Sequence, residues 1–220
     1  MGEKKLNPIT LIVSIIAVVL LILNGVLWYA KGKADKSAAE YKAAYEELLN
    51  EKEQAEQAVN DMEKQSAQYE ANMREVVNLM LDGAVVTENC ANLMQSVWNN
   101  CIYQIRNSET DKHTLNSSGE FYKDFNDALG NLYRDETFIT DNQTISDNQD
   151  KVTKMIRELK NPPEDWKDAY SELLDYYDSY YDFTELVLHT NCSLSEFKEK
   201  FVEYDSESAK RYQKMQLYLD

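Results

Sequence analysis

YKAAYEELLNEKEQAEQAVNDMEKQSAQYEANMREVVNLM, residues 41–80, is the stretch of sequence that decides the fold. A register of positions runs through it at spacings that alternate between four and three. Its members are Tyr41, Tyr45, Leu48, Lys52, Ala55, Val59, Met62, Ser66, Tyr69, Met73, Val76 and Met80. This spacing places every member on one side of an α-helix, and it is typical of a helix that buries a narrow stripe.

The same register continues beyond residue 80 and predicts one long helix. It next meets Gly83, Thr87, Cys90, Met94, Val97 and Cys101. We therefore expect a helix from about residue 34 to residue 106, roughly 110 Å long at 1.5 Å per residue. Asp82-Gly83 is the point at which a kink is expected, because glycine weakens a helix interior.

The two halves of this helix differ in the width of the apolar stripe. Before Tyr69 the stripe is thin and includes Lys52 and Ser66, whereas beyond Met73 it widens to include residues such as Trp98. A thin stripe suits a stalk or a two-helix contact, and a wide stripe suits a packed bundle. We therefore expect a helical, coiled-coil-like stalk over residues 31–69 and a helical bundle domain over residues 70–220.

Start and stop signals divide the remaining sequence into further helices. Ser117 with Glu120, and Ser193 with Glu196, match the capping box that begins a helix. Asn161-Pro162-Pro163 is expected to end one helix and start the next. No segment shows sustained strand alternation, so the sequence predicts an all-α fold whose domain is an antiparallel helical bundle.

An apolar run near the N-terminus predicts a membrane anchor. Residues 9–30 contain no charged residue and would span about 33 Å as a helix, enough to cross the hydrocarbon core of a bilayer. Trp28 and Tyr29 stand where interfacial aromatic residues are expected. A cleavable signal peptide is the main alternative, but its apolar region is usually only about 7–15 residues. We therefore expect a short tail over residues 1–8 and one transmembrane helix within the lipid bilayer.

Two opposing arguments bear on the orientation of this anchor in the membrane. Lys4 and Lys5 precede the span, whereas Lys31, Lys33, Lys36 and Lys42 follow it closely. The lysine count favours a cytoplasmic domain. A short basic tail ahead of a long domain is instead the usual layout of an exported signal-anchor protein.

The charge of the chain limits its partners. The formal net charge is −16 at pH 7, and a surface of this sign repels the phosphates of DNA and RNA. We therefore expect no nucleic-acid binding. The same charge suits solubility, cations or a basic partner.

The helix expected after Pro163 carries a row of carboxylates, which is the candidate docking face. Its spacings of three and four align the row along one side of the helix, and only Lys167 offsets it within that segment. The sequence leaves two interpretations open: a docking face for a basic protein or cell-wall polymer, and an ordinary solvated face. The members of the row are Glu164, Asp168, Glu172, Asp175, Asp178, Asp182 and Glu185.

Cysteine and histidine give few chemical signals. Cys90 and Cys101 are about 16 Å apart along one helix, too far for the limit of about 7 Å between the Cα atoms of a disulfide. Cys192 lies in an expected turn and could pair with either of them, with Cys101 preferred, so a Cys101–Cys192 disulfide and three free thiols both remain open. His113 and His189 have no partners at metal-ligand spacing and are expected to be ordinary polar surface residues.

Three parts of the sequence carry a resemblance to a family. They are Ser96–Tyr103, Asp124–Leu129, and the series formed by LKNPP at 159–163, Ala169-Tyr170, Leu173 and SLSEF at 193–197. Together they resemble a group of uncharacterised membrane-anchored or lipoprotein-like helical proteins of Gram-positive bacteria, which has no assigned activity. The chain departs from that pattern at residues 190–192, where a Pro- or Gly-containing turn is expected. The resemblance implies an exported, extracytoplasmic domain on the cell membrane and supplies no mechanism.

The sequence shows no phosphate-binding glycine loop and no nucleophile elbow. We therefore expect no cofactor, no metal and no catalytic residue. The leading hypothesis is a single-pass, membrane-tethered, non-catalytic interaction or sensing module. The alternative is a structural or assembly protein that self-associates through its stalk, and a cell-wall enzyme is the remote third possibility.

Overall fold

The computed structural model describes residues 38–219, and these residues form an all-helical fold. The predicted all-α class is confirmed, since this part of the chain contains no named strand. Between residues 38 and 219 no helix combines the length and apolar character needed to cross a bilayer. The predicted tail (1–8) and transmembrane helix (9–30) lie outside the described residues. The elements are α2 (Ala38–Tyr103), α3 (Asp111–Thr114), α4 (Phe125–Leu132), α5 (Glu136–Glu158), the 3-10 helix η1 (Glu164–Trp166), α6 (Lys167–Leu188) and α7 (Leu194–Leu219).

The described residues divide into two compact units, one formed by residues 38–70 with Pro162–Lys167 and the other by Ala71–Asn161 with residues 168–219. In the first unit Trp166 packs on α2. Its indole N–H donates to Ser66 Oγ at 2.8 Å, and its ring lies 6.1 Å from the ring of Tyr69. Both partners belong to the predicted register. Further towards the start of α2, Tyr45 and Met62 of the same register are 52% and 40% exposed.

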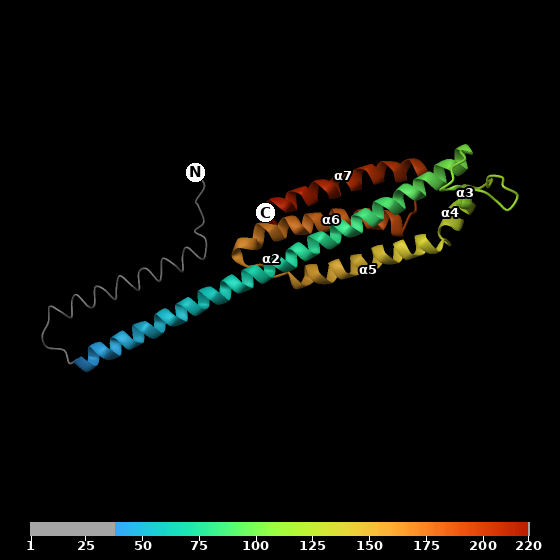
Figure 1. Cartoon of the computed structure of the whole chain (residues 1–220). Helices are drawn as coiled ribbons and strands as arrows, with labels where there is room; N and C mark the ends of the chain where they lie inside the picture. Colours follow the sequence, from blue (N-terminus) through green and yellow to red (C-terminus); the bar gives the residue numbers. More distant parts are fainter. Residues whose placement is uncertain (1–37, 220) are drawn as a thin grey trace, which may run out of the picture. The chain divides into compact units, whose positions relative to one another are not determined.

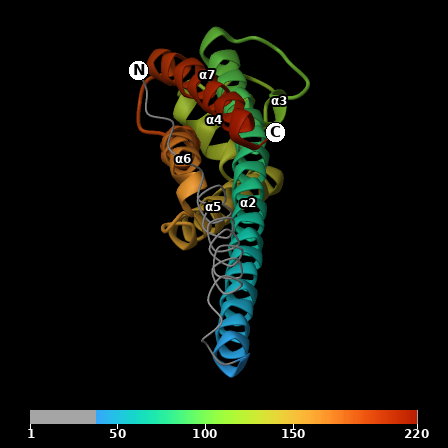
Figure 2. The same cartoon turned by 90° about the vertical axis from the view of Figure 1, so that its left-hand side faces the viewer.

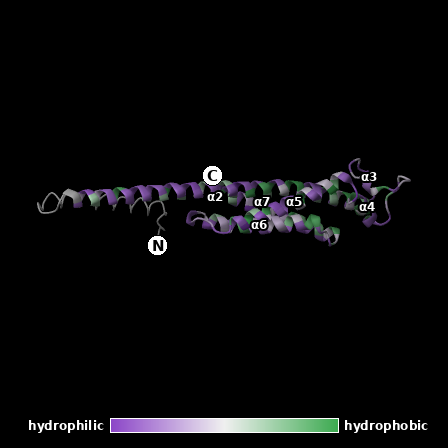
Figure 3. Cartoon of the chain, turned by 90° about the horizontal axis from the view of Figure 1, so that it is seen from below, coloured by the Kyte–Doolittle hydropathy of each residue, from purple (hydrophilic) through white to green (hydrophobic). Residues whose placement is uncertain are grey.

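The second unit is a helical bundle, as predicted. Helices α5, α6 and α7 lie alongside residues 71–103 of α2, and the colours of Figure 1 show that α2 and α6 run opposite to α5 and α7 (Figures 1 and 2). Hydrophobic residues are denser on this part of α2 than on residues 38–70 (Figure 3). The predicted register supplies this face, because all of its members from residue 73 onward are buried. They are Met73, Val76, Met80, Gly83, Thr87, Cys90, Met94, Val97 and Cys101.

A glycine allows α6 to approach α2 across the centre of the bundle. Helix α2 continues as one element through Gly83, and a Cβ atom added there would lie 2.5 Å from the hydroxyl of Tyr180 and 2.4 Å from Nδ2 of Asn148. Asn148, on α5, donates to the backbone carbonyl of Leu79 at 2.6 Å. Three helices therefore meet at one position that has no room for a side chain.

The segment between α2 and α4 differs from the prediction. Ser117 and Glu120 do not begin a helix. Instead, the backbone N–H of Glu120 donates to Asn116 Oδ1 at 3.1 Å, within a turn that contains Gly119 at φ +76°. Helix α4 begins later, where the side chain of Asp124 accepts from the N–H of Asn126 at 2.8 Å. The other two signals are confirmed: α6 follows the prolines through η1, and Ser193 Oγ accepts from the N–H of Glu196 at 3.3 Å at the start of α7.

Candidate binding site

The predicted row of carboxylates does not form a uniformly solvated face. Asp168, Asp178 and Asp182 are exposed, as is Glu164 in the first unit. Glu172 is different, since only 6% of it is exposed. The expectation of a solvated carboxylate was therefore wrong at Glu172, which lies against α7.

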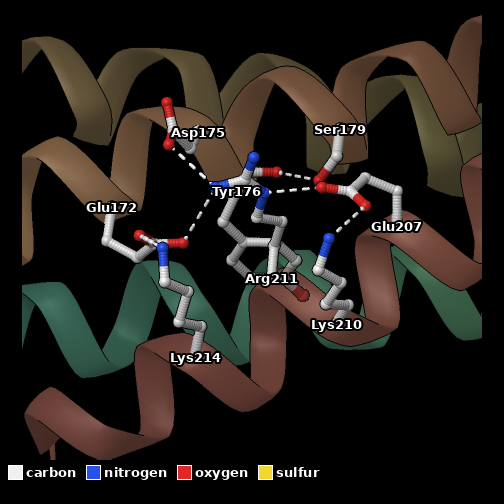
Figure 4. A network of polar contacts seen from close by, with 8 residues as sticks. All are labelled: Glu172, Asp175, Tyr176, Ser179, Glu207, Lys210, Arg211 and Lys214. Carbon is white, nitrogen blue, oxygen red and sulfur yellow. Dashed lines mark hydrogen bonds and ion pairs between the residues drawn. The ribbon is translucent and has the colours of Figure 1, made fainter.

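Cations from α7 neutralise the middle of this row (Figure 4). Arg211 donates to Glu172 at 3.2 Å, to Asp175 at 2.8 Å and to Glu207 at 2.8 Å, and Lys214 donates to Glu172 at 2.5 Å. Burial alone would raise the pKa of Glu172, but the hydrogen bonds from Lys214 and Arg211 outweigh it and hold that pKa below its usual range. These contacts stabilise the pairing of α6 with α7 rather than leaving charge free for a partner.

Single-helix reasoning missed these cations because they lie far along the chain. A signal was present, however. Helices α6 and α7 form a hairpin around residues 189–193, so positions equally distant from that turn face one another. Residue 172 is then paired with a position near residue 210, where the sequence contains Lys210, Arg211 and Lys214.

The clearest concave feature of the second unit is a groove of about 790 Å³ at the end of the bundle. It lies where α2 ends, where α4 crosses and where α7 begins. Its volume falls within the range of about 300–1,000 Å³ that is usual for small-ligand sites. We call it the end groove. Its apolar lining includes Trp98, Phe125, Leu129 and Leu194, and its polar lining includes Asn126, Thr190, Asn191, Ser193, Ser195 and Lys198.

Aromatic packing builds the wall of the end groove. Trp98 is 4% exposed, and its ring lies 5.6 Å from Phe125 of α4 and 6.2 Å from Phe197 of α7. Its indole N–H is buried and has no acceptor within residues 38–219. At the margin, Ile102 and Tyr103 are 42% and 66% exposed. The wall is therefore closely packed, while its edge presents apolar surface to solvent.

The electrostatics of the end groove contrast with those of the chain. The chain contains 39 Asp and Glu residues, yet none of those between residues 38 and 219 lines the groove. Lys198 is its one charged lining residue. The ammonium group of Lys198 donates to Asn99 Oδ1 at 3.2 Å and has no carboxylate partner in the described part of the chain. The end groove therefore combines apolar surface with one lysine that forms no ion pair in the described part of the chain.

Sequence reasoning did not assemble this site, although it had singled out its parts. Trp98 and Tyr103 lie in the first stretch that carries the family resemblance, Phe125 and Leu129 in the second, and Leu194 in the third. These stretches are far apart in the chain. Their meeting depends on the bundle and on the crossing of α4, which no local pattern specifies.

All three cysteines are free thiols in the structure, the alternative to the Cys101–Cys192 disulfide that the sequence left open. Cys101 lies in the core, where its thiol donates to the backbone carbonyl of Tyr122 at 3.6 Å. Burial, with a smaller contribution from Asp141, raises the pKa of Cys90 to about 12. Burial also raises the pKa values of Cys101 and Cys192. None of the three is thus activated as a thiolate.

The prediction for the histidines was half wrong. His189 is exposed, but His113 is only 2% exposed, and its Nε2 has no partner within the described residues. Burial, assisted by Lys112, lowers the pKa of His113 against an opposing effect of Asp135. His113 lies on α3, which packs on α4. Within residues 38–219 no cluster of His, Cys, Asp or Glu is suited to hold a metal ion.

Comparisons of the chain with protein-family models, with curated proteins and with solved structures find no match. The interpretation of the end groove therefore depends on its own geometry and chemistry.

Proposed function

We propose that this chain is a single-pass, membrane-tethered, non-catalytic binding module whose ligand occupies the end groove. The observation that carries the proposal is the combination found there. A groove of about 790 Å³ has an aromatic wall, exposed apolar edges and one lysine that forms no ion pair among the described residues, in a chain of net charge −16. Binding sites are typically concave and mainly apolar, with a few placed polar groups.

The tether in this proposal is the apolar run at residues 9–30, and the domain lies outside the cytoplasm. The length of that run and the bulky Trp28 near its end support an uncleaved anchor. The resemblance to exported helical proteins favours the extracytoplasmic side. The anchor would then keep the bundle beside the membrane, where it meets proteins or polymers of the cell surface.

Site-specific photocrosslinking in the native membrane tests the proposal. A photoreactive amino acid at Tyr103, at the edge of the groove, should give a discrete crosslinked product. The matched control is Val202, which is 66% exposed, as Tyr103 is, but does not line the groove. Equal labelling from both positions, or none from Tyr103, would contradict a ligand site in the end groove.

The alternative of self-association through the stalk retains one specific observation in its favour. Tyr45 and Met62 belong to the register of α2 and remain 52% and 40% exposed, and so does the neighbouring Leu49 at 41%. A stripe of this kind can pair with a second copy. Docking of a basic partner on Asp168, Asp178 and Asp182 also stays a prediction.

A further inference from the structure

We propose that the end groove binds the free C-terminal end of a partner polypeptide that finishes in apolar residues. This inference rests on the proposed function and specifies the ligand. Three properties of the groove support it: its apolar wall, its isolated positive charge, and its supply of amide and hydroxyl groups.

The apolar wall would bind the apolar side chains of such a ligand. Trp98, Phe125 and Leu129 converge from α2 and α4, and Leu194 joins them at the start of α7. Exposed Ile102 and Tyr103 extend the apolar surface beyond the groove. One or two apolar side chains would be removed from water by this surface, which provides the main driving force.

The positive charge of Lys198 would bind the terminal carboxylate of the ligand. Lys198 donates one hydrogen bond to Asn99 and, as an ammonium group, has two further donors available. Nearby Lys200, by contrast, is paired with Glu196 at 2.8 Å. The first residues of α7, Leu194 and Ser195, also line the groove, so the positive end of a long helix lies beside Lys198. An anion is the charged group that this combination favours. The carboxylate in the first turn of α7, Glu196, is paired with Lys200, and no carboxylate among the described residues lines the groove.

The polar lining distinguishes a peptide from a fatty acid. Asn126 and Asn191 provide amides, and Ser195 provides a hydroxyl. The hydroxyl of Thr190 already donates to the backbone carbonyl of Leu186, and that of Ser193 caps α7. A peptide backbone has N–H and C=O groups that the two amides and the Ser195 hydroxyl can satisfy, whereas an acyl chain has none.

The test uses the full-length chain in nanodiscs and two pools of short synthetic peptides. Both pools have random sequences whose last two residues are Leu, Ile or Phe. One ends in a free carboxylate and the other in an amide. We expect the acid pool to be retained about tenfold more strongly than the amide pool, the ratio that one charge-assisted hydrogen bond provides.

Two matched charge variants place the binding in the groove. Lys198→Gln should reduce the preference for the acid pool to about two- to threefold, the share left to the helix N-terminus. Lys210→Gln removes the same charge from an exposed site on α7 that does not line the groove, and it should keep the full preference. Far-UV circular dichroism checks that both variants remain folded.

Each other outcome overturns a defined part of the reasoning. Equal retention of the two pools, or an unchanged preference in Lys198→Gln, would refute terminal-carboxylate recognition while leaving the groove as a binding site. Retention of neither pool together with a crosslink from Tyr103 would refute a peptide C-terminus as the ligand. Retention of neither pool and no crosslink would refute the proposed function as well.

Discussion

Replacing Gly83 with alanine is expected to destabilise the bundle, although alanine is the better helix former. The added Cβ would lie 2.4 Å from Asn148 Nδ2 and 2.5 Å from the hydroxyl of Tyr180. Ordinary contacts between such atoms begin at about 3.5 Å, so each neighbour must retreat by about 1 Å. Neither can do so freely, because Asn148 is hydrogen-bonded to Leu79 and the ring of Tyr180 is fully buried.

Three free-energy contributions decide the sign of this change. Alanine gains about 0.5–1 kcal/mol in helix propensity over glycine. Overpacking of a core costs about 1–3 kcal/mol. Displacement of Asn148 would also lose its hydrogen bond, which contributes roughly 1 kcal/mol. The net loss in the free energy of unfolding is therefore about 1–3 kcal/mol.

Thermal unfolding followed by far-UV circular dichroism measures this loss, at roughly 2–4 °C of Tm per kcal/mol for a domain of this size. A second substitution makes the test specific. The buried hydroxyl of Tyr180 has no hydrogen-bond partner among residues 38–219, so Tyr180→Phe alone should be nearly neutral. Combined with Gly83→Ala, it should restore at least about 1 kcal/mol, because part of the clash is removed. A Gly83→Ala variant that is more stable than the wild type, or strict additivity of the two changes, would refute this account of the bundle centre.

Three further predictions concern the rest of the chain. Glu172→Gln should lower the free energy of unfolding by about 1–3 kcal/mol, because Arg211 and Lys214 lose a buried partner, whereas Asp168→Asn should change it by less than about 0.5 kcal/mol in denaturant titrations. Because burial lowers the pKa of His113, the folded state binds fewer protons than the unfolded state below the usual histidine pKa of about 6.5. Stability should therefore fall as the pH drops below that value, and His113→Gln should reduce the fall in a pH series of unfolding curves; an identical slope would contradict the burial of a neutral imidazole. Removing residues 34–68 should leave the second unit folded by circular dichroism, and loss of its helical signal would show that the division of the chain near residue 70 is wrong.

Periodicity predicted most of the fold because long helices repeat one simple constraint. All members of the register from Tyr69 to Cys101 are buried, because their spacing places them on one side of α2. The helix break at Pro162 and the helix cap at Ser193 also depend on local sequence, and the structure confirms both predictions.

The predictions from sequence failed where a local pattern is compatible with two different structures. Ser117 and Glu120 match a helix start, but Asn116 accepts hydrogen bonds from the N–H groups of Ser118 and Glu120 and so favours a turn instead. Similarly, the row that includes Glu172 looks solvated on its own helix and becomes buried only when α7 packs against it. The end groove is the extreme case, because its lining comes from three distant segments.

Crosslinking from Tyr103 in variants at Gly130 tests the central claim most directly. Gly130 lines the end groove, and a Cβ added there meets nothing closer than the guanidinium of Arg134 at 3.7 Å, so a side chain can start from this position without a clash at its Cβ. Gly130→Trp should fill the groove and abolish the Tyr103 crosslink in native membranes, while Gly130→Ala should preserve it. A crosslink of undiminished strength in a folded Gly130→Trp variant would show that the end groove does not hold the ligand.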